Sequence, residues 1–411
     1  MAVKRNRTRF LAVMVWTLAA CANGVAQVNP RDYSQWRGKD RDGSASGFAQ
    51  PARWPAELTR RWRVEVGEGY ASPLVVGDVV YVFSRREGRE VLSALDADSG
   101  ATRWQSGYAV SYTPSSPTAA HGSGPKATPL FRDGRIITLG ISGIVAAFEA
   151  ETGKLLWRSA EPSEMPFFSA ASSPVGEGRF AITHPGNYGP LTAFDVSSGK
   201  TAWVAGGDAF FMSPTVVTLQ GIRQVVSVTQ EAVIGVSPED GRVMWKFPWT
   251  GGRSGGIMPI LYGDNLILSA STSGVIAINP RYRNGTWQVE KAWETAAVEM
   301  YISHPVIIGD TLFGFSRRAS GQLFALDARD GRTLWLGEPR FATNVAFAKA
   351  GDLLFVLKDD AQLTIARANS SRFEPLKTYE VAEGATWAQP VISGQRLFVK
   401  DVSTLALWTF D

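Results

Sequence analysis

Cysteine and histidine are scarce in this 411-residue chain, which contains one cysteine, Cys21, and three histidines. A single thiol excludes an internal disulfide bond and any zinc site built from several cysteines. His121, His184 and His304 lie far apart in the sequence, without the short spacing that metal ligands show. The sequence therefore predicts no metal site, and it identifies no catalytic residue.

Long hydrophobic runs are also missing, apart from one near the N-terminus. A basic start is followed there by the apolar run from Phe10 to Ala20, which is too short to predict a membrane span. This order is typical of a secretory signal, and we expect the signal to occupy residues 1–26. Cys21 resembles the cysteine of a bacterial lipobox, which would be lipidated, and the alternative is cleavage after Ala26. We therefore expect an exported, periplasmic protein, which lipidation of Cys21 would anchor to the outer membrane.

Charge of one sign shows no excess once the signal is set aside. The whole chain has 42 basic and 38 acidic residues, a net charge of +4. Residues 1–26 hold four of the bases and no acid, so the remainder has 38 of each. This balance gives no reason to expect a nucleic acid or an anionic membrane as a partner. We expect membrane contact only through a lipid anchor.

A repeat that ends in tryptophan occupies most of the chain. The segment LSALDADSGATRW, which ends at Trp104, is closely matched by VAAFEAETGKLLW and LTAFDVSSGKTAW. The spacing between successive repeats is 42 to 53 residues. A period of this length is typical of a propeller or a solenoid. The repeats end at Trp104, Trp157, Trp203, Trp245 and Trp335, with weaker matches ending at Trp293 and Tyr379 and an incomplete one at Trp62.

Each repeat reads as one four-stranded blade of a β-propeller. An acid and a glycine mark the turn before the tryptophan strand, and a Ser-Pro, Thr-Pro or His-Pro pair commonly opens the first strand. Counting first strands gives eight blades, with seven as the alternative count. The last blade lacks one strand, which the segment from Arg61 to Val66 would supply, closing the ring. We therefore expect the propeller over residues 58–411, with the segment 27–57 wrapped around its rim.

The repeat resembles the tryptophan-docking motif of pyrroloquinoline-quinone (PQQ)-like propellers, of the quinoprotein alcohol dehydrogenase-like superfamily. It is similar in style to the propeller lipoprotein of the machinery that assembles outer-membrane β-barrels. The segment QWRG…RDG, residues 35–38 and 41–43, resembles one found in secreted bacterial proteins of the same superfamily. An indole at the same place in every blade is best explained by packing between blades. The tryptophans assigned to this structural role are Trp62, Trp104, Trp157, Trp203, Trp245, Trp293 and Trp335.

Candidate binding residues lie in the loops that lead from each tryptophan strand to the next blade. These loops reach the innermost strands, so their side chains are expected to converge at the mouth of the central channel. The alternative is that these side chains only fill the channel. The candidates are Tyr70, His121, Lys126, Phe168, Met212, Arg253, Tyr301, His304 and Trp387.

Two classes of function remain open at this stage. The first is a monomeric, protein-binding scaffold of the envelope that captures extended peptide segments and needs no cofactor. The resemblance implies a role for it in outer-membrane protein assembly. The second is an enzyme that uses the central channel. For a quinoprotein dehydrogenase the resemblance implies PQQ beside a calcium ion, an acidic base and a pair of adjacent cysteines, and the alternative within this class is another small-molecule enzyme, such as a hydrolase or lyase. An acid of the channel loops such as Glu299 is a candidate base, but the sequence shows no cluster of calcium ligands, and the cysteine pair is missing. We expect the scaffold.

Overall fold

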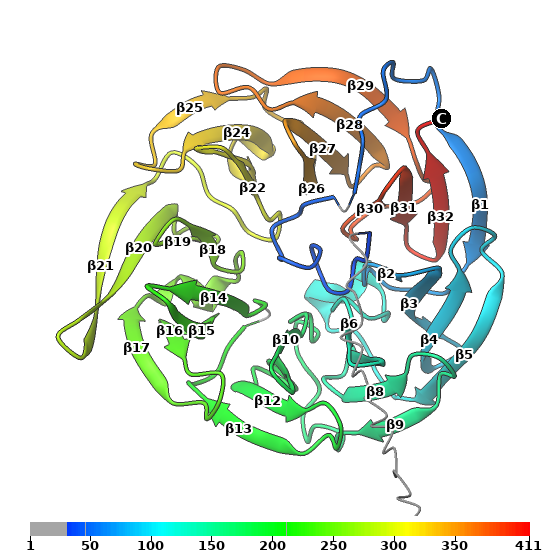
Figure 1. The fold of residues 1–411 in the computed structure, drawn as a ribbon, viewed down its shortest axis with the longest axis horizontal. Helices are drawn as coiled ribbons and strands as arrows, with labels where there is room; N and C mark the ends of the chain where they lie inside the picture. The colour runs from blue at the N-terminus through cyan, green and yellow to red at the C-terminus, as the bar shows by residue number, and fades with distance from the viewer. Residues whose placement is uncertain (1–30, 46, 211) are drawn as a thin grey trace, which may run out of the picture.

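The computed structural model describes residues 31–411 apart from 46 and 211. The predicted signal and Cys21 lie outside the described residues. Eight four-stranded antiparallel sheets surround a central channel, as Figure 1 shows along the axis of the ring. This arrangement confirms the predicted eight-bladed propeller. Within the described residues no helix is long and apolar enough to cross a membrane.

The strands of each blade run in order from the channel to the rim. The first four blades contain β2 (Leu74–Val76), β3 (Val79–Arg86), β4 (Arg89–Asp96) and β5 (Thr102–Ala109); β6 (Leu130–Arg132), β7 (Arg135–Leu139), β8 (Val145–Glu149) and β9 (Leu155–Arg158); β10 (Val175–Glu177), β11 (Phe180–Thr183), β12 (Leu191–Asp195) and β13 (Thr201–Ala205); and β14 (Thr215–Leu219), β15 (Ile222–Val228), β16 (Ala232–Val236) and β17 (Val243–Pro248).

The next four blades follow the same plan. They contain β18 (Ile260–Tyr262), β19 (Asn265–Ser269), β20 (Val275–Arg283) and β21 (Thr286–Thr295); β22 (Val306–Ile308), β23 (Thr311–Ser316), β24 (Gln322–Asp327) and β25 (Thr333–Leu336); β26 (Val345–Ala350), β27 (Leu353–Lys358), β28 (Gln362–Arg367) and β29 (Glu374–Glu380); and β30 (Val391–Ser393), β31 (Arg396–Lys400), β32 (Thr404–Thr409) and β1 (Thr59–Glu65).

The ring is closed where the two ends of the propeller sequence meet. Strand β1 pairs antiparallel with β32, with Trp62 opposite Leu407, and forms the outermost strand of the last blade. Blue β1 lies beside red β32 in Figure 1. The predicted closing segment therefore has the predicted role. Closure leaves the last blade with its full set of strands and no incomplete sheet.

The repeat tryptophans pack against the turn of the following blade. The indole Nε1–H of Trp62 donates to the carbonyl of Ala97 at 3.1 Å, and a β-carbon at Gly100 would lie 2.8 Å from the same ring. Glycine is required there because φ is +72° and the indole fills the space of a side chain. Trp203 repeats the contact, donating to the carbonyl of Pro238 at 3.1 Å. These contacts place the indoles between blades.

Trp245 departs from this pattern. Its Nε1–H donates to the side-chain oxygen of Gln224 at 2.5 Å, and Gln224 belongs to the same blade. Its ring also covers Gly235, where a β-carbon would collide with it. Trp245 therefore stabilises its own sheet in addition to lying in the core between blades.

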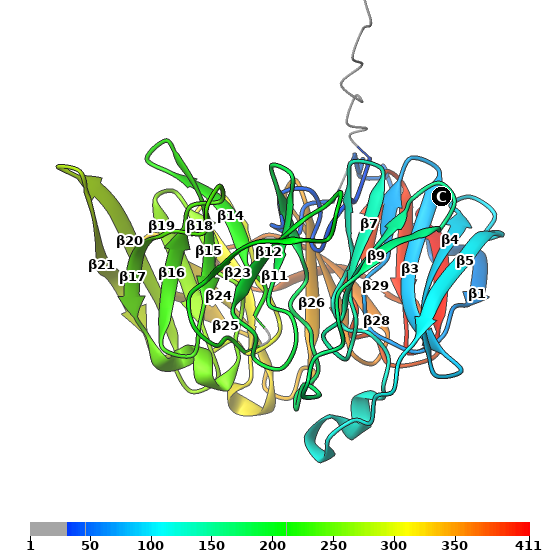
Figure 2. The ribbon, with the colours of Figure 1, turned by 90° about the horizontal axis from the view of Figure 1, so that it is seen from below.

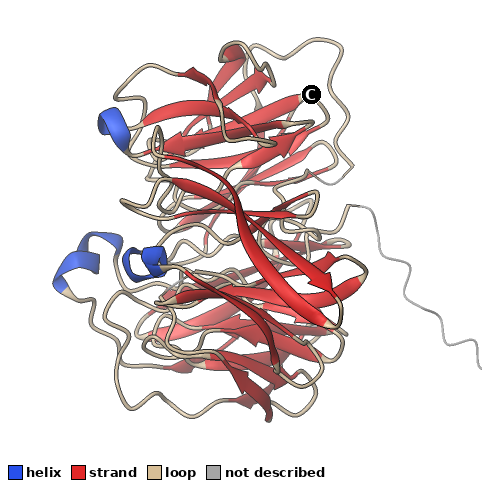
Figure 3. Ribbon diagram, turned by 90° about the vertical axis from the view of Figure 1, so that its left-hand side faces the viewer, coloured by secondary structure: helices blue, strands red, loops and turns tan. Residues whose placement is uncertain are grey.

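The two faces of the ring differ in their connections. Three short 3₁₀ helices, η1 (Ser116–His121), η2 (Thr250–Ser254) and η3 (Arg318–Ser320), lie on one face, which we call the loop face (Figures 2 and 3). The opposite face carries tight hairpin turns, such as the one between β2 and β3, and we call it the turn face. The hairpin of β20 and β21 extends beyond the rim (Figure 1).

The N-terminal segment does not wrap the rim, as its composition led us to expect, but enters the channel from the turn face. Tyr33 pairs with Val75 of β2, and Ser44 pairs with Lys349 of β26, so the segment is held by the innermost strands of the two blades that flank the last blade. Figure 1 shows it, in dark blue, inside the ring. The expectation failed because main-chain hydrogen bonds to the innermost strands, which have no signature in composition, hold the segment there.

Candidate functional site

A cavity of about 370 Å³ lies at the mouth of the channel on the loop face. Such a volume is near the lower end of the range for small-molecule sites. Its wall is mostly aromatic, with hydroxyl and amide groups between the rings. It is lined by Trp36, Tyr70, Ser72, Thr118, His121, Lys126, Thr128, Phe168, Ala171, Ser173, Tyr301, Ile302, Trp387 and Gln389.

Six of the nine predicted binding residues line this cavity: Tyr70, His121, Lys126, Phe168, Tyr301 and Trp387. The imidazole of His121 meets the indole of Trp387 edge to face, with ring centroids 4.6 Å apart. The ring centroid of Tyr70 lies 6.2 Å from that of His121 and 6.3 Å from that of Trp387, so these three rings form one side of the cavity mouth. Burial lowers the pKa of His121, and Lys126 nearby lowers it further, which favours a neutral ring.

Among the residues that the structure describes, Lys126 is the only lysine or arginine that lines the cavity. Its ammonium donates to the hydroxyl oxygen of Ser169 at 2.8 Å, and the phenol of Tyr112 donates to the same oxygen at 3.2 Å. Burial lowers the pKa of Lys126 to about 8. The group therefore remains largely charged at neutral pH in partly desolvated surroundings.

The other three predicted binding residues do not line the cavity. Met212 is buried in the core between blades. Arg253 is exposed on η2 and forms an ion pair with Glu231 at 3.5 Å. Both predictions were wrong about orientation, because the spacing of a non-repeating loop does not determine which way its side chains point.

His304 lies behind the cavity wall. Its Nε2 accepts a hydrogen bond from the backbone N–H of Met258 at 2.9 Å, and its Nδ1 lies 2.9 Å from the carbonyl oxygen of Ile302. These partners define a neutral ring that carries its proton on Nδ1. Burial, followed by the nearby charge of Arg37, lowers the pKa of His304 well below its ordinary value. The histidine therefore connects two blades.

Hydrogen bonds between neighbouring blades explain why serine or threonine precedes the first strand of several blades. The backbone N–H of Ser72 donates to the hydroxyl of Thr128 in the next blade at 3.1 Å. Thr128 donates in the same way to Ser173 at 3.0 Å, and Ser173 to Ser213 at 2.9 Å. Each bond satisfies an N–H beside the channel that has no partner in its own sheet. The hydroxyl groups in the cavity wall are therefore structural.

Trp36 forms the floor of the cavity and was missing from the predicted set. It comes from the N-terminal segment and meets the ring of His304 edge to face, with centroids 4.5 Å apart. Arg37 donates to the carbonyls of His304 and Pro305, at 3.2 and 2.6 Å. Arg41 donates to those of Pro174 and Ser173 across the channel. This segment closes the channel, so the cavity is open only on the loop face.

The two buried arginines of this segment have altered pKa values. Desolvation lowers the pKa of Arg37 to about 10 and that of Arg41 to about 9. Their carbonyl partners compensate in part for the lost water. The sequence did offer a signal, since both arginines belong to the QWRG…RDG segment. Composition alone could not show that the segment lies in the channel.

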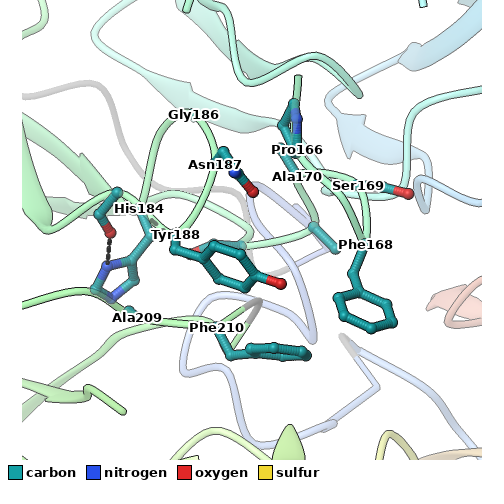
Figure 4. Close-up of a pocket in the computed structure, with 13 residues that line it drawn as sticks. Pro166, Phe168, Ser169, Ala170, His184, Gly186, Asn187, Tyr188, Ala209 and Phe210 are labelled. Atoms are coloured by element: carbon teal, nitrogen blue, oxygen red, sulfur yellow. Dashed lines mark hydrogen bonds between the residues drawn. The ribbon is translucent and has the colours of Figure 1, made fainter. Parts of the chain in front are cut away.

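A second aromatic group lies on the loop face next to the cavity. Phe168 and Phe210 have ring centroids 5.1 Å apart, and Tyr188 lies 5.3 Å from Phe210. Figure 4 shows these three rings turned toward one another. His184 lies behind them and is buried, with hydrogen bonds to the Gly189 carbonyl and the Ser227 hydroxyl. It therefore supports the loop.

The cavity wall does not suit PQQ and a calcium ion. Calcium takes oxygen ligands, above all carboxylates, and no Asp or Glu lines the cavity within the described residues. Those residues also contain no group of three or more His, Cys, Asp and Glu that could hold a metal. Glu299, the acid named from the sequence, forms an ion pair with Arg318 at 3.6 Å and does not line the cavity.

Known proteins support the fold and the family. The family model "Outer membrane protein assembly factor BamB" matches residues 54–209 and 211–411, whereas no curated protein matches the sequence. Among solved structures, BamB from Moraxella catarrhalis has a TM-score of 0.63 at 17% identity, covering 87% of this chain and 98% of that one. A europium-containing methanol dehydrogenase has 0.62 at 13% identity, covering 92% and 98%. A quinohemoprotein alcohol dehydrogenase from Comamonas testosteroni has 0.64 at 13%, covering 94% and 81%. With most of its length matched, the chain belongs to the BamB family of PQQ-like propellers.

Proposed function

We propose that this chain is a protein-binding propeller of the cell envelope that takes part in outer-membrane protein assembly and offers its loop face to partner polypeptides. The observation that carries the proposal is the apolar surface beside the cavity. Met165 and Phe167 lie in the loop between β9 and β10 with 43% and 51% of their surface exposed. Exposed apolar side chains that adjoin an aromatic pocket are typical of a surface that binds protein.

The exposed ring of Phe167 stands on a well-connected loop. Its backbone N–H donates to the side-chain oxygen of Asn187 at 3.1 Å, and its carbonyl accepts from the hydroxyl of Ser115. The ring also meets that of Phe168 edge to face at 4.8 Å. A partner would lose little loop entropy on binding a ring that is already held in place.

Several features support the cellular setting that we propose. The basic and apolar start of the sequence is typical of export, and Cys21 resembles a lipidated cysteine. The family description names an outer-membrane assembly factor. We propose that the protein acts as a monomer without a resident cofactor, and that its partners are envelope proteins presenting extended segments. No observation in the cavity favours an enzyme over this role.

Photo-crosslinking tests the proposal. A benzophenone amino acid at Phe167 should crosslink polypeptides of the outer-membrane assembly pathway in living cells, identified by mass spectrometry. The matched control is the same substitution at Leu336 of β25, which is equally exposed at 51% but lies on an outermost strand. Indistinguishable products from the two sites, or products from neither, would contradict a binding role for the loop face.

A further inference from the structure

The cavity at the channel mouth is closed on the side that faces the N-terminal segment. Trp36 forms its floor, and behind it the N-terminal segment is held by the buried side chains of Arg37 and Arg41. A polypeptide therefore cannot thread through the ring from the loop face. A space of about 370 Å³ with one opening has room for a chain end or a small molecule, and not for a folded partner.

The charge in this cavity is unbalanced. Lys126 forms no ion pair within the described residues, and no carboxylate stands in the wall. One of its three N–H donors is used on Ser169, at 2.8 Å. The two carboxylates nearest to Tyr70 at the cavity mouth, Glu68 and Asp401, do not line the cavity. Asp401 also accepts hydrogen bonds from the backbone N–H groups of Ser403 and Thr404. An ammonium with spare donors in such surroundings favours an anion.

The rest of the wall is suited to an apolar group beside that anion. Trp36, Phe168, Tyr301 and Trp387 present aromatic surface, which gains from covering another ring or an aliphatic chain. The neighbouring hydroxyls of Thr128 and Ser173 already accept hydrogen bonds from neighbouring blades. The wall therefore offers one cation and much apolar surface.

We propose that this cavity binds the C-terminal residue of a partner polypeptide, with an apolar or aromatic side chain against the indoles and the free α-carboxylate on the ammonium of Lys126. The inference rests on the proposed function and names the chemistry of the partner. Of the two kinds of occupant that the cavity has room for, a chain end is the one that a protein-binding propeller would meet, and its terminal carboxylate supplies the charge that the wall lacks. Charge-assisted hydrogen bonds of this kind discriminate strongly between an acid and its amide.

Peptide binding to the full-length protein tests the inference. The probe is a fluorescein-labelled hexapeptide that ends in phenylalanine, prepared with a free carboxylate and as the C-terminal amide. The wild-type protein should bind the acid at least about tenfold more tightly than the amide. Lys126→Met should abolish this preference, whereas Lys126→Arg should retain most of it. Lys39→Met is the control, since Lys39 is exposed and pairs only with Asp40.

Each outcome decides a different point. Equal affinity for acid and amide in the wild-type protein would overturn the inference, as would an unchanged preference in Lys126→Met that melts like wild type. If N-acetylphenylalanine competes as well as the peptide acid does, the carboxylate site stands, but a polypeptide as its source is overturned. Binding that depends on Lys126 without any crosslink from Phe167 would contradict the proposed function alone. Crosslinks without such binding would contradict the inference alone.

Discussion

The hydroxyl of Ser227 in β15 lies 2.6 Å from Nε2 of His184, a residue of the preceding blade. Nδ1 of the same ring lies 3.0 Å from the carbonyl oxygen of Gly189, so the ring carries its proton on Nδ1 and accepts at Nε2. Burial lowers the pKa of His184 to about 4. The neutral ring is therefore part of the contact between two blades, and protonation would remove the acceptor.

Acid should destabilise the propeller through His184. The unfolded chain, with a histidine pKa of about 6.5, binds more protons than the folded protein between that pH and pH 4. The stabilisation is therefore fully present above about pH 6.5 and is lost as the pH falls toward 4, by about 3 kcal/mol. Urea unfolding at pH 7, 5 and 4 measures this loss. In His184→Gln the gap from wild type should narrow with acid, and a constant gap would rule out this histidine.

The indole of Trp203 should account for a large part of the contact between its blade and the next. It is buried and donates to Pro238, and a β-carbon at Gly241 would lie 2.8 Å from it. Trp203→Ala should lower the free energy of unfolding by about 3–5 kcal/mol, because it opens a cavity and leaves a carbonyl unpaired. Trp203→Phe, which keeps a ring, should lose less.

Guanidinium denaturation followed by circular dichroism measures both losses. Leu336→Ala is the control, since its side chain is half exposed on an outermost strand and should change stability by no more than about 0.5 kcal/mol. Similar losses in Trp203→Ala and in the control would contradict a docking role for the indole.

The ring could be predicted from the sequence because most blades repeat the same pattern of strands and turns, which ends in a tryptophan. The spacing of Trp62 and its counterparts predicts a ring of blades, the count of first strands favours eight over seven, and the missing strand of the last blade predicts the closure. The loops between blades must reach the axis, so Tyr70, Lys126 and Trp387 could be placed at the channel mouth without coordinates. Each of these predictions rests on the geometry of the fold.

What the sequence could not predict depends on contacts that occur once. Trp36 lines the cavity because the segment around it pairs with β2 and β26, the innermost strands of the two blades that flank the last blade. His304 was expected to bind, but its ring is engaged by Met258, which no spacing rule relates to it. Met212 and Arg253 belong to the right kind of loop, but Met212 packs in the core and Arg253 pairs with Glu231, so neither lines the cavity.

Arg37 should be essential to the closed channel. Its guanidinium is fully buried and donates to the carbonyls of His304 and Pro305, so Arg37→Met would leave these acceptors without partners. We expect a loss of about 3 kcal/mol in stability and faster proteolysis after Lys39 or Arg41, because the segment would detach from the inner strands. Timed trypsin digestion with mass spectrometry measures the cleavage, and urea unfolding measures the stability. Asp40→Asn is the matched control, since its carboxylate is exposed and pairs only with Lys39. Detachment would also remove the floor that Trp36 provides for the cavity. Equal cleavage rates in Arg37→Met and the control would show that contacts other than those of Arg37 hold the segment.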